Sequence, residues 1–292
     1  MAAGDNAAGA RARTLRRMTR RRTLAGRTIL MSGGSRGIGL AIAVRAARDG
    51  ANVAMVAKTG EPHPRLPGTV HSACEEVERA GGRALAIVGD IRRPDDIDRA
   101  VSETVATFGG IDICVNNASA IDLSPTATLP AKRFDLMQAV NVRGTFLLSQ
   151  ACLPHLARGV NPHILTLSPP LNLDPHWLGD HLGYTLSKYG MTLCTLGLAD
   201  ELRHLGIAAN SLWPRTLIAT AALRNLADGT VERSRRPEIM GDAAHAILTR
   251  PAADCTGELL VDEDVLRQEG VQDFDGYRAG SEAPSLDLFL DA

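Results

Sequence analysis

A tyrosine and a lysine stand four residues apart in the stretch Tyr184-Thr-Leu-Ser-Lys188. Residues at this spacing share one face of a helix, so the phenol and the ammonium would lie close together. A free phenol has a pKa near 10 and exchanges protons poorly at neutral pH. A nearby cation lowers the pKa, and Tyr184 could then give a proton to a substrate oxygen or take one from it. The alternative interpretation is an exposed helical pair with no catalytic role.

Three further polar residues stand where they could serve the same chemistry. Asn117 belongs to Asn116-Asn117-Ala118-Ser119, which closes an apolar run, and Ser168 closes another. Asn141 lies in the middle of a long expected helix, where a buried amide needs partners and could bend the helix or hold a water near Lys188. Ser168 could polarise a substrate oxygen. Taken alone, each asparagine is more often a turn residue or a satisfied core group.

A glycine-rich stretch, Ser32-Gly-Gly-Ser-Arg-Gly-Ile-Gly39, follows an apolar run and precedes an amphipathic one. Glycines in a strand–turn–helix context allow the backbone to approach a pyrophosphate, whose charge meets the helix N-terminus. An isolated glycine cluster is usually only a turn, but this context predicts a dinucleotide site. The candidate cofactor-binding residues of the loop are Gly33, Ser35, Arg36, Gly37, Ile38 and Gly39.

The end of the second strand favours NADP over NAD. NAD-binding proteins usually place an acid there for the ribose 2′-hydroxyl, but this chain has Lys58, and Arg36 lies in the glycine loop. Two cations would attract a 2′-phosphate, unless both are merely solvated surface charges. Asp90, at the end of the third strand, could accept a hydrogen bond from an adenine amino group or cap the helix before Pro94.

The elements that must position these residues alternate along the chain. The expected strands cover 28–32, 52–57, 84–88, 111–115, 163–168, 207–213 and 258–261. The expected helices cover 37–49, a segment from about Val70, 95–108, 134–156, 183–205 and 237–248. Strands that are apolar on both faces and alternate with helices indicate a parallel sheet covered on both sides. The prediction is a single-domain α/β protein with a Rossmann-type, doubly wound sheet.

Charge and composition limit the partners and the domains. Residues 1–27 hold eight arginines and one acid, whereas the rest of the chain has more acidic than basic residues, which argues against nucleic-acid binding. Residues 1–24 are expected to be a disordered basic leader, sequence upstream of a true start at Met18, or a transit-type segment. The catalytic domain is expected over 25–270 and a tail over 271–292, whose apolar residues 286–290 could dock on the body.

The sequence predicts neither a membrane span nor a metal site. No apolar run reaches the ~20 residues that a span needs, and the histidines lack metal-ligand spacing. The five scattered cysteines form no Cys-x-x-Cys pair, which favours the reducing cytoplasm. The expected helix after Tyr184 is apolar nearly all round, so one face would remain uncovered in a monomer.

The ordered set of motifs resembles the short-chain dehydrogenase/reductase family. It comprises the glycine stretch, Asn117 with its neighbours, Asn141, the Tyr184/Lys188 pair and the turn at Pro214. The resemblance covers about residues 25–262. It implies a Rossmann-type subunit that assembles into a homodimer or homotetramer through its two long helices.

The resemblance also implies roles for individual residues. Tyr184 would be the proton donor or acceptor, Lys188 would bind ribose and tune Tyr184, and Asn141 would complete a proton relay. Gly33 to Gly39, Lys58, Asp90 and Asn117 would line NADP. The chain departs from the family in two places. Pro169 stands where the polarising serine is usual, with Ser168 one residue earlier, and Arg215 replaces the glycine after Pro214. Thr216 and Thr220 remain candidate contacts to the cofactor's nicotinamide side.

The expected function is therefore NADP(H)-dependent interconversion of a carbonyl and an alcohol. The segment between Pro169 and Leu182 is mostly apolar, which favours a hydrophobic small-molecule substrate. The alternative is a non-catalytic dinucleotide-binding redox sensor or scaffold, because a fold does not fix a function. The retained Tyr184/Lys188 pair argues against that alternative.

Overall fold

The computed structural model describes residues 22–62, 67–224 and 230–291, and within them it contains one parallel sheet. The strands are β1 (Thr28–Ser32), β2 (Asn52–Ala57), β3 (Arg83–Val88), β4 (Ile113–Asn116), β5 (His163–Thr166), β6 (Ala208–Trp213) and β7 (Leu259–Val261). Their order across the sheet is β3-β2-β1-β4-β5-β6-β7, and every neighbouring pair is parallel. This is the doubly wound topology that the sequence predicts.

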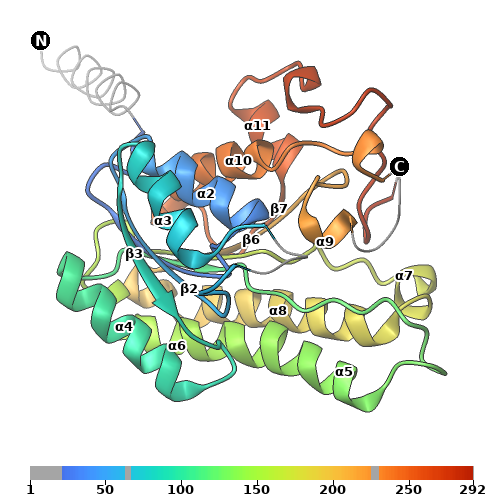
Figure 1. Cartoon of the computed structure of the whole chain (residues 1–292), viewed down its shortest axis with the longest axis horizontal. Helices are drawn as coiled ribbons and strands as arrows, with labels where there is room; N and C mark the ends of the chain where they lie inside the picture. Colours follow the sequence, from blue (N-terminus) through green and yellow to red (C-terminus); the bar gives the residue numbers. More distant parts are fainter. Residues whose placement is uncertain (1–21, 63–66, 225–229, 292) are drawn as a thin grey trace, which may run out of the picture.

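Helices cover both faces of the sheet (Figure 1). One face carries α2 (Gly37–Ala47), α3 (Val70–Arg79), α10 (Glu238–Leu248) and α11 (Asp262–Gln268). The other carries α4 (Pro94–Phe108), α6 (Gly144–Leu156) and α8 (Leu182–Glu201). The remaining α-helices of the described residues are α5 (Ala131–Met137), α7 (Pro175–Gly179) and α9 (Ala221–Arg224). Because both faces are covered, β1, β4, β5 and β6 are buried along their whole length.

The strand order reverses beside β1, which lies between β2 and β4 although β4 comes three crossovers later. In doubly wound sheets, ligands bind at the carboxyl ends of the strands next to such a reversal. The glycine stretch follows β1 and Asn117 follows β4, so both belong to this edge. The segments after β5 and β6 bring Ser168 and Thr216 to the same edge.

The helix expected over 134–156 is longer and less regular than predicted. It begins with α5, passes through a π-helical segment (Gln138–Arg143) and continues as α6. Asn141 lies in this π-helical segment, is fully buried and exchanges two hydrogen bonds with the backbone of Ala120. A π-bulge often marks a functional position, and here it accommodates the buried amide that the sequence expected to bend the helix.

Both predicted ends of the catalytic domain extend further than expected. Most of the predicted leader, residues 1–21, lies outside the described residues. Its last residues belong to the fold, because Leu24 is buried and donates its backbone N–H to Asp49. The predicted tail also packs on the body, since Phe274 and Phe289 are buried. The folded unit therefore includes Leu24 and the segment up to residue 291.

Candidate active site

The glycine loop between β1 and α2 has the conformation that phosphate-binding loops need. Gly33 and Gly37 have φ angles of 71° and 57°, which L-residues rarely adopt. A Cβ atom on Gly39 would come within 2.6 Å of the Gly33 carbonyl oxygen. Within the described residues, no side chain caps the N-terminus of α2. The loop is therefore tightly packed, and its uncapped N–H groups suit a pyrophosphate.

Asn117 holds this loop in place. Its side-chain amide donates hydrogen bonds to the carbonyl oxygens of Ser32, at 3.3 Å, and Gly33, at 2.8 Å. The Ser32 hydroxyl in turn accepts the backbone N–H groups of Asn117 and Ala118. Asn117 thus joins the end of β4 to the end of β1, which couples two parts of the predicted cofactor site.

The two cations predicted to favour NADP lie in different surroundings. Lys58 is exposed, and its ammonium lies 3.6 Å from the Asp90 carboxylate. Arg36 donates to the Gly68 carbonyl oxygen at 2.8 Å, its Nε is buried without a partner among the described residues, and burial lowers its pKa. An unpaired guanidinium N–H at the glycine loop is a donor that an anion could satisfy.

Asp90 is paired more closely with protein groups than either sequence interpretation expected. Its carboxylate binds the Arg92 guanidinium and accepts the Arg92 backbone N–H. These contacts, with Lys58, lower the Asp90 pKa to about 2. The N-cap residue of α4 is Arg93, so Asp90 does not cap that helix. The carboxylate stays ionised, and Arg92 and Lys58 would compete with an adenine amino group for it.

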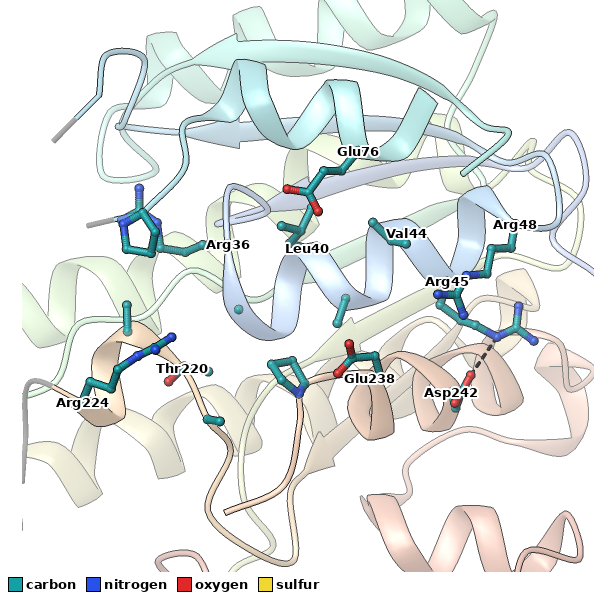
Figure 2. A pocket seen from close by; sticks show the side chains of 16 residues that line it. Arg36, Leu40, Val44, Arg45, Arg48, Glu76, Thr220, Arg224, Glu238 and Asp242 are labelled. Carbon is teal, nitrogen blue, oxygen red and sulfur yellow. Dashed lines mark hydrogen bonds and ion pairs between the residues drawn. The ribbon is translucent and has the colours of Figure 1, made fainter. Parts of the chain in front are cut away.

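A cavity of about 240 Å³ runs along the outer side of α2 (Figure 2). Figure 2 shows Arg36 and Arg224 on either side of one end of this cavity, with Thr220 close to Arg224. Arg45 lies toward the other end, where it pairs with Asp242 at 2.9 Å. Thr220 also packs beside Gly37, where an added Cβ would lie 3.2 Å from the Thr220 methyl group. The predicted contacts Arg36, Gly37 and Thr220 therefore come together at the start of α2.

Tyr184 and Lys188 lie one turn apart on α8, as their spacing predicts, and both are buried. The Lys188 ammonium donates to the Leu167 carbonyl oxygen at 2.6 Å and lies 4.9 Å from the centre of the Trp213 ring. Burial lowers the Lys188 pKa to about 7, and Asp287 opposes that shift. The ammonium is therefore held beside the end of β5, close to Ser168.

In the protein without a cofactor the Tyr184 pKa is raised, whereas the predicted lowering relied on Lys188 together with a positively charged nicotinamide. Burial raises the pKa of Tyr184 above its ordinary value, and the carboxylate of Asp287 raises it further. Lys188 directs its ammonium toward Leu167 and Trp213, where it does not offset the loss of hydration around the phenol. Any stabilisation of the phenolate must therefore come from groups that bind at this edge of the sheet.

Among the buried hydroxyls that lack partners within the described residues, two belong to residues that follow a strand at this edge. They are the hydroxyls of Ser168, which is fully buried after β5, and Thr216, which follows β6. Leaving a buried hydroxyl unpaired costs free energy, so such groups commonly mark a place where a ligand completes the hydrogen bonds. Together with the glycine loop, these hydroxyls fit a nicotinamide dinucleotide and a carbonyl oxygen.

Asn141 connects the π-helical segment to α8. Its amide donates to the Ser187 hydroxyl at 2.9 Å, and that hydroxyl donates to the Tyr184 carbonyl oxygen at 2.8 Å. The Asn141 oxygen accepts the Ala120 N–H at 2.7 Å. One lone pair of that oxygen remains for a water. Asn141 therefore fixes the turn of α8 that carries Tyr184.

The structure adds three groups that the sequence did not assign to the site. Trp213 lies under Lys188, and Phe289 stacks on Tyr184 with ring centres 6.2 Å apart. Burial raises the pKa of Asp287 to about 7, with Asp262 contributing and Lys188 opposing. The only signal for the C-terminal residues was the apolar run at 286–290, which does not specify where that run docks.

In the described part of the chain, no group of three or more His, Cys, Asp or Glu side chains is arranged to hold a metal ion. Among the helices in 22–62, 67–224 and 230–291, none is long and apolar enough to cross a membrane.

Comparison with known proteins agrees with the site. A family model described as short chain dehydrogenase matches residues 27–230. The chain is 53% identical over 270 residues to hydroxysteroid dehydrogenase-like protein 2 of Danio rerio. That match covers 92% of this chain and 65% of the relative, so the chain spans about two thirds of the relative's length.

Solved structures show the same relationship. A short chain dehydrogenase from Mycobacterium thermoresistibile is 56% identical, with a TM-score of 0.87, over 92% of this chain and 97% of that one. A short chain dehydrogenase from Mycobacterium paratuberculosis, bound to NAD, shares the fold at 24% identity and a TM-score of 0.70. It matches 82% of this chain and 97% of its own.

Proposed function

The chain belongs to the short-chain dehydrogenase family, and from this premise we propose that it is an NADP(H)-dependent oxidoreductase acting on a hydrophobic carbonyl or alcohol. Three observations carry the proposal: Tyr184 and Lys188 are buried one turn apart on α8, Lys188 binds the Leu167 carbonyl oxygen next to Ser168 in the chain, and the Ser168 hydroxyl lacks a partner among the described residues. Together these residues offer a proton donor, a cation and a hydrogen-bond donor at the same edge of the sheet. The apolar residues around Tyr184 support a hydrophobic substrate.

In the proposed reduction, bound NADPH supplies the hydride. Ser168 donates a hydrogen bond to the substrate carbonyl oxygen and polarises it. Tyr184 transfers its proton to that oxygen, and the phenolate that remains would be stabilised by the positive charge of the bound oxidised cofactor, whose ribose Lys188 would hold. Asn141 keeps Tyr184 in place through Ser187 and offers its free lone pair to a water of the proton relay.

The cofactor would lie along the carboxyl edge from β3 to β6. The glycine loop and the N-terminus of α2 would hold the pyrophosphate, with Ser35, Ile38 and Gly39 in the same turn. Lys58 and Arg36 would bind the 2′-phosphate, because no acid stands at the end of β2 to repel it. Thr216 and Thr220 would contact the nicotinamide side, where the Thr216 hydroxyl lacks a partner among the described residues.

The cysteines and the exposed apolar side chains support a location and an assembly for the protein. Five free cysteines suit a reducing compartment, and we place the protein in the cytoplasm. The exposed apolar side chains of Phe146, Leu186 and Leu193 on α6 and α8 support a homodimer or homotetramer.

The test is NADPH oxidation with a panel of aldehydes and ketones. We expect Tyr184→Phe to lower kcat by at least about 100-fold while NADPH binding persists, because the phenol supplies the proton. Tyr277→Phe is the matched control, since Tyr277 donates its hydroxyl to Asp242 of α10, which covers the opposite face of the sheet from the helix of Tyr184. NADPH binding without Tyr184-dependent turnover would favour a redox sensor or scaffold instead.

A further inference from the structure

The C-terminal segment of residues 285–291 passes directly beside the catalytic tyrosine. It is fixed to the chain after β6, because Leu217 donates its N–H to Ser285 and Asp287 donates its N–H to Arg215, both at 3.0 Å. Thr216 and Leu286 form an antiparallel bridge between the same two stretches.

Phe289 is the centre of an aromatic cluster around this segment. Its side chain is 1% exposed. Its ring centre lies 5.3–6.2 Å from five other rings, those of Trp177, His181, Tyr184, Tyr189 and Trp213. The Tyr184 ring is stacked on it with an interplanar angle of 29°. The catalytic side chain therefore has the benzyl group of a residue 105 positions later as a direct neighbour.

The segment is held rigidly in this position. Trp213 donates its indole N–H to the Leu288 carbonyl oxygen, and Trp177 donates its indole N–H to the Asp291 carboxylate, each at 3.0 Å. Asn172 donates to the same carboxylate at 2.8 Å. Phe289 itself has a φ of 71°, a costly conformation for a non-glycine residue, which persists only where neighbouring contacts enforce it.

We propose that Phe289 is a specificity-determining residue whose ring forms the substrate-site wall beside Tyr184 and limits the size of the apolar substrate. The proposal rests on the catalytic role of Tyr184 given above. The indole N–H groups of the cluster bind the segment's own oxygens. The other side chains packed in this cluster include aromatic rings and the aliphatic chains of Leu123, Leu129 and Leu171, and with Phe289 only 1% exposed they leave little free space beside Tyr184. Such a wall accepts a flat, apolar, ring-bearing carbonyl compound and excludes larger ones.

The kinetic test compares benzaldehyde with a larger tricyclic ketone in wild type and Phe289→Ala. Removing the benzyl group leaves a cavity next to Tyr184, so the ratio of kcat/KM for the larger over the smaller substrate should rise at least about 10-fold. The KM for NADPH should not change. Phe274→Ala is the matched control, because Phe274 is also buried but packs on Arg235 and Arg267. A ratio within twofold of wild type would overturn the proposal.

A binding measurement separates this proposal from the proposed function. The chain has two tryptophans, Trp177 and Trp213, and both contact Phe289, so intrinsic fluorescence reports on this site. We expect 1-indanone, without cofactor, to bind Phe289→Ala at least about 10-fold more tightly than wild type. Tighter binding of 1-indanone with no turnover in wild type or variant would support the role of Phe289 and refute the proposed oxidoreductase activity. Turnover with no change in the kcat/KM ratio or in 1-indanone affinity would refute the role of Phe289 alone. If Phe289→Ala does not fold, Phe289→Leu must show both effects in the same direction.

Discussion

Lys58 is the residue on which the cofactor preference depends most directly. It is exposed at the end of β2, where a carboxylate would instead select NAD. In Lys58→Asp a new negative charge would repel the 2′-phosphate. We expect the KM for NADPH to rise about 10-fold and the KM for NADH to fall, because the substitution removes a cation and adds an anion beside the 2′-phosphate. Steady-state kinetics with both cofactors measure the effect.

The matched control is Lys132→Asp, which makes the same change at an exposed lysine of α5. It should leave both KM values within twofold of wild type. An unchanged NADPH-to-NADH preference in Lys58→Asp would show that the 2′-phosphate is recognised elsewhere, with Arg36 as the first residue to examine.

Asp262 makes the stability of the protein depend on pH. One oxygen of its carboxylate accepts the N–H groups of Arg215 and Glu263, and the other is buried without a partner among the described residues. Burial, with Glu263 adding to it, raises the pKa to about 7. The folded state therefore binds this proton more tightly than the unfolded state, whose aspartate pKa is near 3.9. The stability from this proton is present at low pH and is lost as pH rises toward 7.

The test is the free energy of unfolding between pH 5 and pH 7. In Asp262→Asn the free energy of unfolding should decrease over this range by about 1–2 kcal/mol less than in wild type. Asp98→Asn, at an exposed position of α4, is the control and should retain the wild-type slope. An Asp262→Asn slope equal to that of wild type would mean that Asp262 does not hold a proton in this range.

At the level of elements, the start of α2 depends on the small size of Gly39. An alanine Cβ there would lie 2.6 Å from the Gly33 carbonyl oxygen and would also meet the Asn117 amide, so the loop would have to move. We expect Gly39→Ala to weaken NADPH binding at least about 10-fold, because the N–H groups would lose their alignment with the pyrophosphate. Isothermal titration calorimetry measures the affinity.

Gly110→Ala is the control for that substitution, because a Cβ atom at Gly110 would meet nothing within 4 Å. It should bind NADPH as wild type does. Wild-type affinity in Gly39→Ala would show that the loop can shift without cost, and that the close packing of Gly39 does not serve the cofactor.

The same elements show which features a sequence can predict. The Tyr184/Lys188 pair and the glycine loop depend on spacing within one turn or one helix, and the structure has both as expected. The π-helical segment was not predicted, because it depends on contacts of Asn141 with Ala120 and Ser187, which are distant in sequence.

Pairing and burial explain the other differences. Asp90 was open to two interpretations because the sequence does not show that Arg92 folds back onto it. The tyrosine pKa was expected to fall because a neighbouring cation is visible in the sequence, whereas the burial that raises it is not. The sequence did not assign Phe289 to the site, because its position beside Tyr184 depends on the path of the chain after β6.

For the whole molecule, the uncovered face of α6 and α8 predicts self-association. Leu193 is 58% exposed, Phe146 is 48% exposed, and a groove between their helices is lined by Gly190, Cys194 and Gly197. A second copy packed on this face would remove these apolar side chains from water.

We expect wild type to have at least twice the monomer mass by light scattering. Leu193→Glu should be a monomer, because an unpaired carboxylate is costly to bury. Leu173→Glu, at a more exposed leucine outside both helices, should keep the wild-type mass. A monomeric wild type would refute the assembly, and an oligomeric Leu193→Glu would place the interface elsewhere.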